Sequence, residues 1–249
     1  MNITKTSNPT LGKNAFANEP AATNGEVMTM KGAINKTIIL FGILLVSAIL
    51  SCRLTLSGEF GLNSSMLIAS SIGAFIIAIV TSFVKKASPI TAPIYAALEG
   101  FVLGSISSLF EIAYGGIVFQ AITLTLLVFG LMLFLYKTGI LKASNKFVKG
   151  VVIATSAIAI FYFISIIVSL FTPAINNFLW ANPIIGIIVS VIIVAVAALN
   201  LILDFSSIES YANSGSPKYM EWYAGFGLMV TLVWLYIEIL RLLSYFRRN

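Results

Sequence analysis

The chain contains a single aspartate, Asp204, which follows the apolar run PIIGIIVSVIIVAVAALNLIL. On a helix, Asn200, Asp204 and Ser207 are spaced i, i+4 and i+7, so they share one face with the small residue Ala197. A carboxylate can bind a hard cation when it is ionised, and it can donate a hydrogen bond when it is protonated. A charge at the centre of a membrane helix costs roughly 2.5 to 3.5 kcal/mol. We therefore predict that Asp204 is an ion-pathway residue and the candidate metal ligand, with Asn200 beside it.

A second interpretation of Asp204 stays open on the sequence. If Pro183 lies at the outer membrane surface, a helical rise of 1.5 Å per residue brings Asp204 about 31 Å across the bilayer. That position is close to the inner headgroups. Asp204 would then be an interfacial carboxylate without a transport role.

Two further acids lie inside other apolar runs. Glu99 is the most deeply placed, and Gly100 and Gly104 beside it have the GxxxG spacing that lets another helix approach closely. Glu99 is either an ion-pathway residue or a hydrogen-bonded packing residue. Glu238 and Arg241 stand at i, i+3, so the simpler interpretation is an ion pair within one helix.

Glu221 lies in the first turn of the last apolar run, where a negative charge suits the positive end of the helix dipole. It also lies across a short connecting loop from Asp204, which makes it the acid most able to approach that aspartate. Trp180 and Trp222 are expected near opposite membrane faces, as interfacial anchors.

The composition is that of an integral membrane protein. The 249 residues are 59% hydrophobic and only 10% charged, against about 25% charged in a typical soluble domain. The net charge of +6 does not indicate nucleic-acid binding, because the basic residues occur in short loops and form no continuous face. Cys52 is the single cysteine, so no intramolecular disulfide can form. Histidine is absent, and proton sensing must therefore use carboxylates.

The residues present exclude several enzymes and cofactors. A retinal protein would need a lysine in the last run, and a metalloprotease or a serine rhomboid would need histidine. An aspartyl protease would need a second aspartate. We therefore expect that the protein is not an enzyme and has no cofactor.

Seven apolar runs are each long enough to supply the roughly 20 residues that span a bilayer. They are predicted at about 37–56, 64–84, 90–112 and 117–136, then a run that follows the lysines of 137–149 and ends at 171, then 183–210 and 219–246. Residues 1–36 lack apolar periodicity and are predicted to form a disordered polar tail. The fold class is an all-α polytopic membrane helix bundle over residues 37–249.

The basic residues predict the orientation of this bundle. With the N-terminus inside, the inner side holds all eleven lysines, and the four arginines are outside. This asymmetry predicts a cytoplasmic N-terminus and an external C-terminus. The terminal pair Arg247 and Arg248 is discordant, and it would be inside if the seventh run were re-entrant or if only six runs spanned.

Three stretches together resemble the Bax inhibitor-1 superfamily, and specifically its prokaryotic YccA-like branch. They are SNPTLGKNAF with MTMKGAINKTIIL, then APIYAALEGFVLGSIS, and finally LDFSSIE with EWYAGFGLMVTLVWLYIEILRLL. The resemblance covers most of the chain. It implies a bundle in which the last helix is surrounded by the other six, in the plasma (inner) membrane of a bacterium.

The resemblance also implies a pH-sensitive cation leak, best supported for calcium, controlled by two aspartates on the last two helices. Asp204 matches the first aspartate. Counting back from the arginine of the final helix puts Thr231 at the second position, whereas the Leu-Tyr-x-acid pattern puts Glu238 there. An aspartate is present at neither.

Two functional hypotheses follow. The first is a pH-sensitive cation (calcium) leak channel or ion/proton exchanger that uses intramembrane carboxylates. The alternative is a non-conducting membrane interaction protein that modulates a membrane protease or a stress response. Flux through purified protein in liposomes distinguishes the two.

Overall fold

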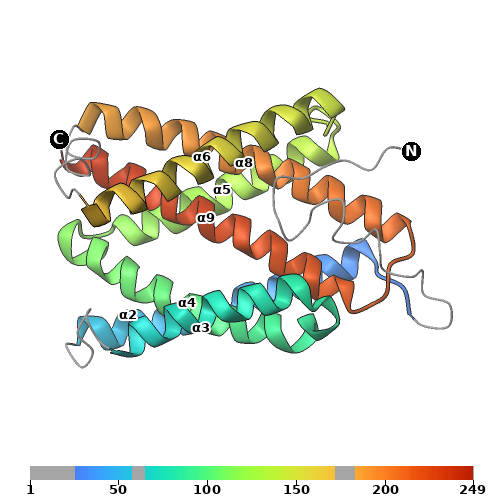
Figure 1. Cartoon of the computed structure of the whole chain (residues 1–249), viewed down its shortest axis with the longest axis horizontal. Helices are drawn as coiled ribbons and strands as arrows, with labels where there is room; N and C mark the ends of the chain where they lie inside the picture. The colour runs from blue at the N-terminus through green and yellow to red at the C-terminus, as the bar shows by residue number, and fades with distance from the viewer. Residues whose placement is uncertain (1–25, 58–64, 172–182, 249) are drawn as a thin grey trace. The chain divides into compact units, whose positions relative to one another are not determined.

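The computed structural model describes residues 26–57, 65–171 and 183–248. Within these ranges the chain forms seven long helices and one short 3-10 helix (Figure 1). They are α2 (Met30–Leu56), α3 (Ser65–Phe83), η1 (Lys85–Ala87), α4 (Ser88–Ala113), α5 (Ile117–Lys137), α6 (Asn145–Phe171), α8 (Pro183–Asn213) and α9 (Met220–Arg248). Each long helix has the length and apolar composition of a membrane span. The prediction of an all-helical polytopic membrane protein is confirmed.

The first helix begins earlier than the sequence analysis predicted. Helix α2 starts at Met30 rather than at Thr37, because Thr29 caps it: the Thr29 hydroxyl accepts a hydrogen bond of 2.9 Å from the backbone N–H of Gly32. The last seven residues of the expected polar tail are therefore helical. Residues 26–29 are not helical, and the rest of that prediction, over 1–25, lies outside the described residues, as does Trp180.

Helix α6 also begins early, at Asn145, so Lys146 and Lys149 lie in the helix and not in the expected basic loop. The Ser144 hydroxyl accepts a hydrogen bond from the backbone N–H of Phe147 at 3.3 Å, which is a serine cap. Helix α8 ends at Asn213, three residues after the predicted end at 210. Because α8 is longer than predicted, Asp204 lies further from its C-terminal end.

The described residues divide into two compact units. Unit 1 comprises 119–171, 183–207 and 231–248, and unit 2 comprises 26–57, 65–118 and 208–230. Unit 1 therefore holds α5, α6, the first part of α8 and the second part of α9, and unit 2 holds α2, α3, α4 and the remaining turns of α8 and α9.

In unit 2, helix α4 packs against both α2 and α3 (Figure 1). The GxxxG pair makes the contact with α2: a methyl group on Gly100 would overlap the carbonyl of Leu44, and one on Gly104 would overlap the carbonyl of Ala48. The Ser51 hydroxyl then donates to the carbonyl oxygen of Phe101 at 2.7 Å. The close approach predicted from the glycine spacing is confirmed.

The seven consecutive residues 223–229 of α9 are all buried, so these turns have no lipid-facing side. The last helix is surrounded here, as predicted. The outward surface elsewhere is apolar, with exposed side chains that include Ile38, Phe75, Phe119, Ile153 and Ile184. Exposed apolar surface of this extent on long helices is covered by lipid.

Candidate functional site

Asp204 is fully buried in unit 1, within a stretch of α8, 200–205, that is buried on all sides. The hydroxyl of Thr231 on α9 donates a hydrogen bond of 2.6 Å to Asp204 Oδ2. Since α8 continues to Asn213, Asp204 lies nine residues, or about 13.5 Å, from the helix end. A helix of 31 residues is about 46 Å long, and a hydrocarbon core of about 30 Å centred on it includes Asp204. On that centring Asp204 lies about 6 Å inside the edge of the core, so the interfacial interpretation stays open beside the ion-pathway prediction.

The other polar residues on this face of α8 are buried as well. The Asn200 amide donates to the hydroxyl of Thr155 on α6 and to the carbonyl of Val196, both at 2.8 Å. Ser207 is fully buried, and its hydroxyl has no hydrogen-bond partner among the described residues. The polar face predicted from the spacing of these residues therefore points inward. Its use in ion transport stays a prediction.

The structure decides which residue lies opposite Asp204. Thr231 contacts it, whereas Glu238 lies seven residues further along α9 and belongs to a different cluster. The position obtained by counting back from Arg241 is therefore the one in contact. Asp204 receives its α9 hydrogen bond from a neutral hydroxyl at the position where the resemblance implied an aspartate.

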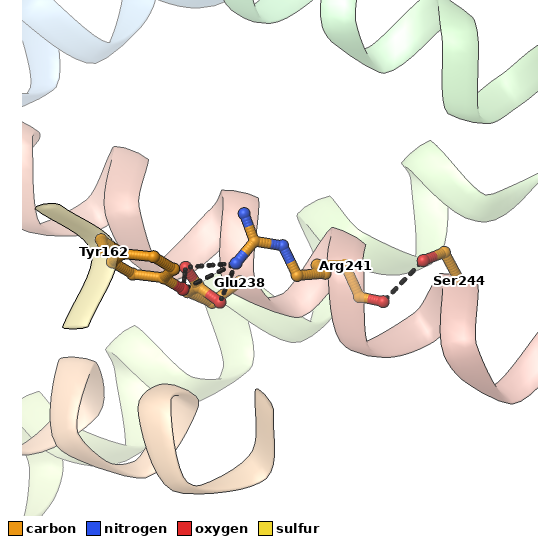
Figure 2. A network of polar contacts seen from close by, with 4 residues as sticks. All are labelled: Tyr162, Glu238, Arg241 and Ser244. Carbon is orange, nitrogen blue, oxygen red and sulfur yellow. Dashed lines mark hydrogen bonds and ion pairs between the residues drawn. The ribbon is translucent and has the colours of Figure 1, made fainter. Parts of the chain in front are cut away.

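The second cluster joins Glu238 and Arg241 on α9 to Tyr162 on α6 (Figure 2). The Tyr162 hydroxyl donates to Glu238 Oε1 at 2.7 Å and accepts from Arg241 Nη1 at 2.6 Å. Arg241 Nη1 also lies 3.4 Å from both carboxylate oxygens, so the predicted ion pair is confirmed. No sequence pattern pointed to Tyr162, because it stands 76 residues away from Glu238 in an aromatic stretch of an apolar run.

Glu221 lies in the first turn of α9 as predicted, and its carboxylate is used at the start of another helix. Its Oε1 atom accepts hydrogen bonds of 3.1 Å from both the backbone N–H and the hydroxyl of Thr29, the N-cap of α2. Gly32 is required there, because a methyl group at that position would overlap the Glu221 carboxylate. The negative charge therefore meets the positive end of the α2 dipole.

Two further contacts lie close to this junction in unit 2. The ammonium of Lys36 lies 4.6 Å from the centre of the Trp222 ring. Lys218 Nζ lies 2.8 Å from Glu26 Oε2 on the surface. The hydrogen bond and charge of Lys218 lower the pKa of the Glu26 carboxyl, and Glu26 raises the pKa of Lys218.

The remaining membrane acids have other environments. Glu99 is half-buried in α4, and its carboxylate makes no hydrogen bond or ion pair with the described residues. Glu111, at the end of α4, accepts hydrogen bonds from the backbone N–H groups of Gly116 and Val118, at 2.5 and 3.1 Å, and so caps the start of α5.

The part of the chain that the structure describes contains no group of three or more cysteine, aspartate or glutamate side chains that could hold a metal ion. A cation at Asp204 would therefore take most of its ligands from neutral oxygens, such as hydroxyl, amide and backbone carbonyl groups.

The fold and the buried polar face define a multi-pass helical membrane protein with an ionisable group inside its span. The chain belongs to the Bax inhibitor 1 like family, whose model matches residues 8–248. The family predicted from the sequence motifs is confirmed. A comparison with curated proteins and one with solved structures gave no match.

Proposed function

We propose that the protein is a pH-sensitive cation leak or cation/proton exchanger in which Asp204 takes up a cation or a proton in alternation. The observation that supports this function is the full burial of Asp204 inside a membrane span, with the Thr231 hydroxyl 2.6 Å away. Placing an ionisable group inside a membrane span costs free energy, and such a residue is therefore a candidate for a functional role. Calcium is the cation that the family resemblance favours.

The geometry of the pair suits exchange. When Asp204 is ionised, the Thr231 hydroxyl donates to it, as in the structure. When Asp204 is protonated, its own O–H can donate to the Thr231 oxygen, because a hydroxyl is both donor and acceptor. The interhelical hydrogen bond therefore survives either protonation state, and a proton can replace a cation without loss of the helix contact.

The neighbouring polar groups provide steps along α8. Asn200 is one turn before Asp204 on the helix, and Ser207 is one turn after it. The two residues that carry the amide and hydroxyl oxygens are therefore offset from Asp204 by about 4 to 6 Å along the helix axis. The Ser207 hydroxyl is buried without a partner among the described residues, and it is available to a passing ion or to water. Oxygen ligands in series are the means by which channels replace the hydration shell of an ion.

We also propose that the protein acts by transport and not by catalysis, and that it lies in the plasma (inner) membrane of a bacterium with its N-terminus in the cytoplasm. The eleven lysines and four arginines support this orientation. A tag on the C-terminus that is accessible only from the cytoplasm would contradict seven full crossings.

The test is cation flux into proteoliposomes at several pH values. Calcium, sodium and potassium are compared for the wild type, for Asp204→Asn and for the control Glu209→Gln, which removes an exposed acid from the same helix. We expect Asp204→Asn to abolish most of the flux and its pH dependence, and the control to retain both. Absence of flux from the wild type at every pH would favour the non-conducting interaction protein.

A further inference from the structure

The Tyr162–Glu238–Arg241 cluster lies in the same unit as Asp204. Tyr162 lies on the face of α6 that carries Thr155, and Glu238 lies on the face of α9 that carries Thr231. Tyr162 is seven residues after Thr155 on α6, and Glu238 is seven residues after Thr231 on α9. Seven residues are nearly two turns, with an angular drift of only about 20° and a rise of about 10.5 Å. The cluster therefore stands about 10 Å from the Asp204 level along one shared line of polar groups.

The hydrogen bonds connect three helices along this line. Asn200 on α8 bonds Thr155 on α6, and Asp204 on α8 bonds Thr231 on α9. At the second level, α6 is bonded directly to α9 through Tyr162. Each pair among α6, α8 and α9 is thus joined by polar side chains within the membrane span.

Helix α8 contributes no charge at the second level. It runs antiparallel to α9, since a short loop connects the two and Gly186 near the start of α8 meets the ring of Tyr245 near the end of α9. Seven residues back from Asp204 is Ala197, which is fully buried and has a small side chain. Among the described residues of α6, α8 and α9, the charges at the level of Glu238 therefore come from α9.

The distances show how this second level is held together. The direct contacts between Arg241 Nη1 and the Glu238 carboxylate are 3.4 Å, which is long for a charge-assisted hydrogen bond. The Tyr162 hydroxyl lies within 2.7 Å of both groups (Figure 2). Tyr162 therefore makes the two short hydrogen bonds of the cluster, and these bonds connect α6 to the ion pair of α9.

We propose that Tyr162, Glu238 and Arg241 form a gate in series with Asp204 on a single cation path. This inference rests on the proposed function of Asp204. In the closed state, Tyr162 and Arg241 occupy the Glu238 carboxylate, and the fixed positive charge of the guanidinium opposes the entry of a cation. Opening requires Tyr162 to release Glu238, whose carboxylate then accepts the cation that leaves Asp204.

The main test is Arg241→Gln in proteoliposomes, with Arg247→Gln as the matched control. Arg247 lies on the same helix, and it bonds Gln120 in an exposed position outside the cluster. We expect Arg241→Gln to raise cation flux several-fold above the wild type, since the opposing charge is gone, and Arg247→Gln to leave it unchanged. The double variant Asp204→Asn with Arg241→Gln should be silent, because the two levels act in series.

A purely structural cluster would give a different pattern. Glu238→Gln should lower flux under the gate hypothesis, in the opposite direction to Arg241→Gln, whereas loss of structure would lower flux in both. Tyr162→Phe removes only the bridging hydroxyl, and it should raise flux even if Arg241→Gln does not fold. Wild-type or reduced flux in folded Tyr162→Phe, checked by size-exclusion chromatography, would overturn the gate.

These outcomes separate the two proposals. Wild-type flux in Asp204→Asn would reject the proposed function together with the gate. A silent Asp204→Asn, combined with wild-type flux in both Arg241→Gln and Tyr162→Phe, would reject the gate alone.

Discussion

Asp204 and Glu238 are two fully buried carboxylates in unit 1, and their surroundings differ in charge. Asp204 receives a hydrogen bond from the neutral Thr231 hydroxyl, whereas Glu238 is held by a tyrosine and by a guanidinium. An ion pair at Glu238 is already neutral, and separating it leaves two charges in a low-dielectric region. Under the proposed function, Asp204 is the group that changes its charge, and Glu238 is the group that changes its partner.

A third buried acid, Glu221 in unit 2, makes its hydrogen bonds at the start of a helix. It accepts hydrogen bonds from the N-cap of α2, and it occupies the space that a side chain at position 32 would fill. Helix-end contacts of this kind satisfy backbone donors that have no partner within the helix. Its fixed place in the packing indicates a role in stability.

The largest expected effect on stability comes from breaking the charge pair. Arg241→Leu leaves the Glu238 carboxylate buried without its cation, and we expect a loss of about 3 kcal/mol in the free energy of unfolding. The double variant Arg241→Gln with Glu238→Gln removes both charges and should recover most of that loss. Unfolding in mixed detergent micelles measures both, and equal losses in the two variants would contradict charge compensation.

A smaller effect is expected from Thr231→Val, which keeps the side-chain shape and removes the hydroxyl that bonds Asp204. A hydrogen bond to an ionised group contributes about 1.5 to 3 kcal/mol, and one between neutral groups about 1 kcal/mol. Under the proposed function, in which Asp204 alternates between a proton and a cation, the loss of stability should therefore be larger at a pH where the carboxyl is ionised than at one where it is protonated. A loss that does not vary with pH would mean that Asp204 keeps one charge state across the range.

Thr29→Ala tests the structural carboxylate in unit 2. It removes the side-chain cap of α2 and one of the two donors to Glu221, so we expect a loss of about 1 kcal/mol in stability. Cation flux should stay at the wild-type level once the protein is folded. A flux change that matches Asp204→Asn would instead assign Glu221 to the ion path, as hairpin geometry alone had suggested.

The smallest expected effect comes from the exposed pair of Glu26 and Lys218. The pKa of Glu26 is lowered in the folded state, so its stabilising contribution is present above the unfolded pKa and is lost as pH falls through the folded pKa. Lys218→Gln should lower the thermal midpoint slightly at neutral pH and have no effect in strong acid. Added salt should reduce the difference at neutral pH, because the pair is exposed. A difference that persists in acid would mean that the effect does not come from this pair.

Residue patterns along single helices were enough to predict much of the fold and part of the site. Runs of about 20 apolar residues fixed the seven spans, and the spacing of Asn200, Asp204 and Ser207 fixed their common face. The glycine spacing in α4 predicted a close helix contact, and the i, i+3 spacing predicted the Glu238–Arg241 pair. The errors were at helix ends, where the caps at Thr29 and Ser144 extended α2 and α6.

The sequence by itself therefore determined the class of protein, its family and the face of α8 that carries the acid. Only the tertiary structure decided that Thr231 contacts Asp204, that Tyr162 bridges Glu238 and Arg241, and that Glu221 bonds the start of α2. Helical periodicity states which residues share a face of one helix. Which two faces meet depends on the rotation and axial offset of each helix, and an apolar helix is as compatible with lipid as with another helix, so close packing and polar contacts between distant segments make that choice.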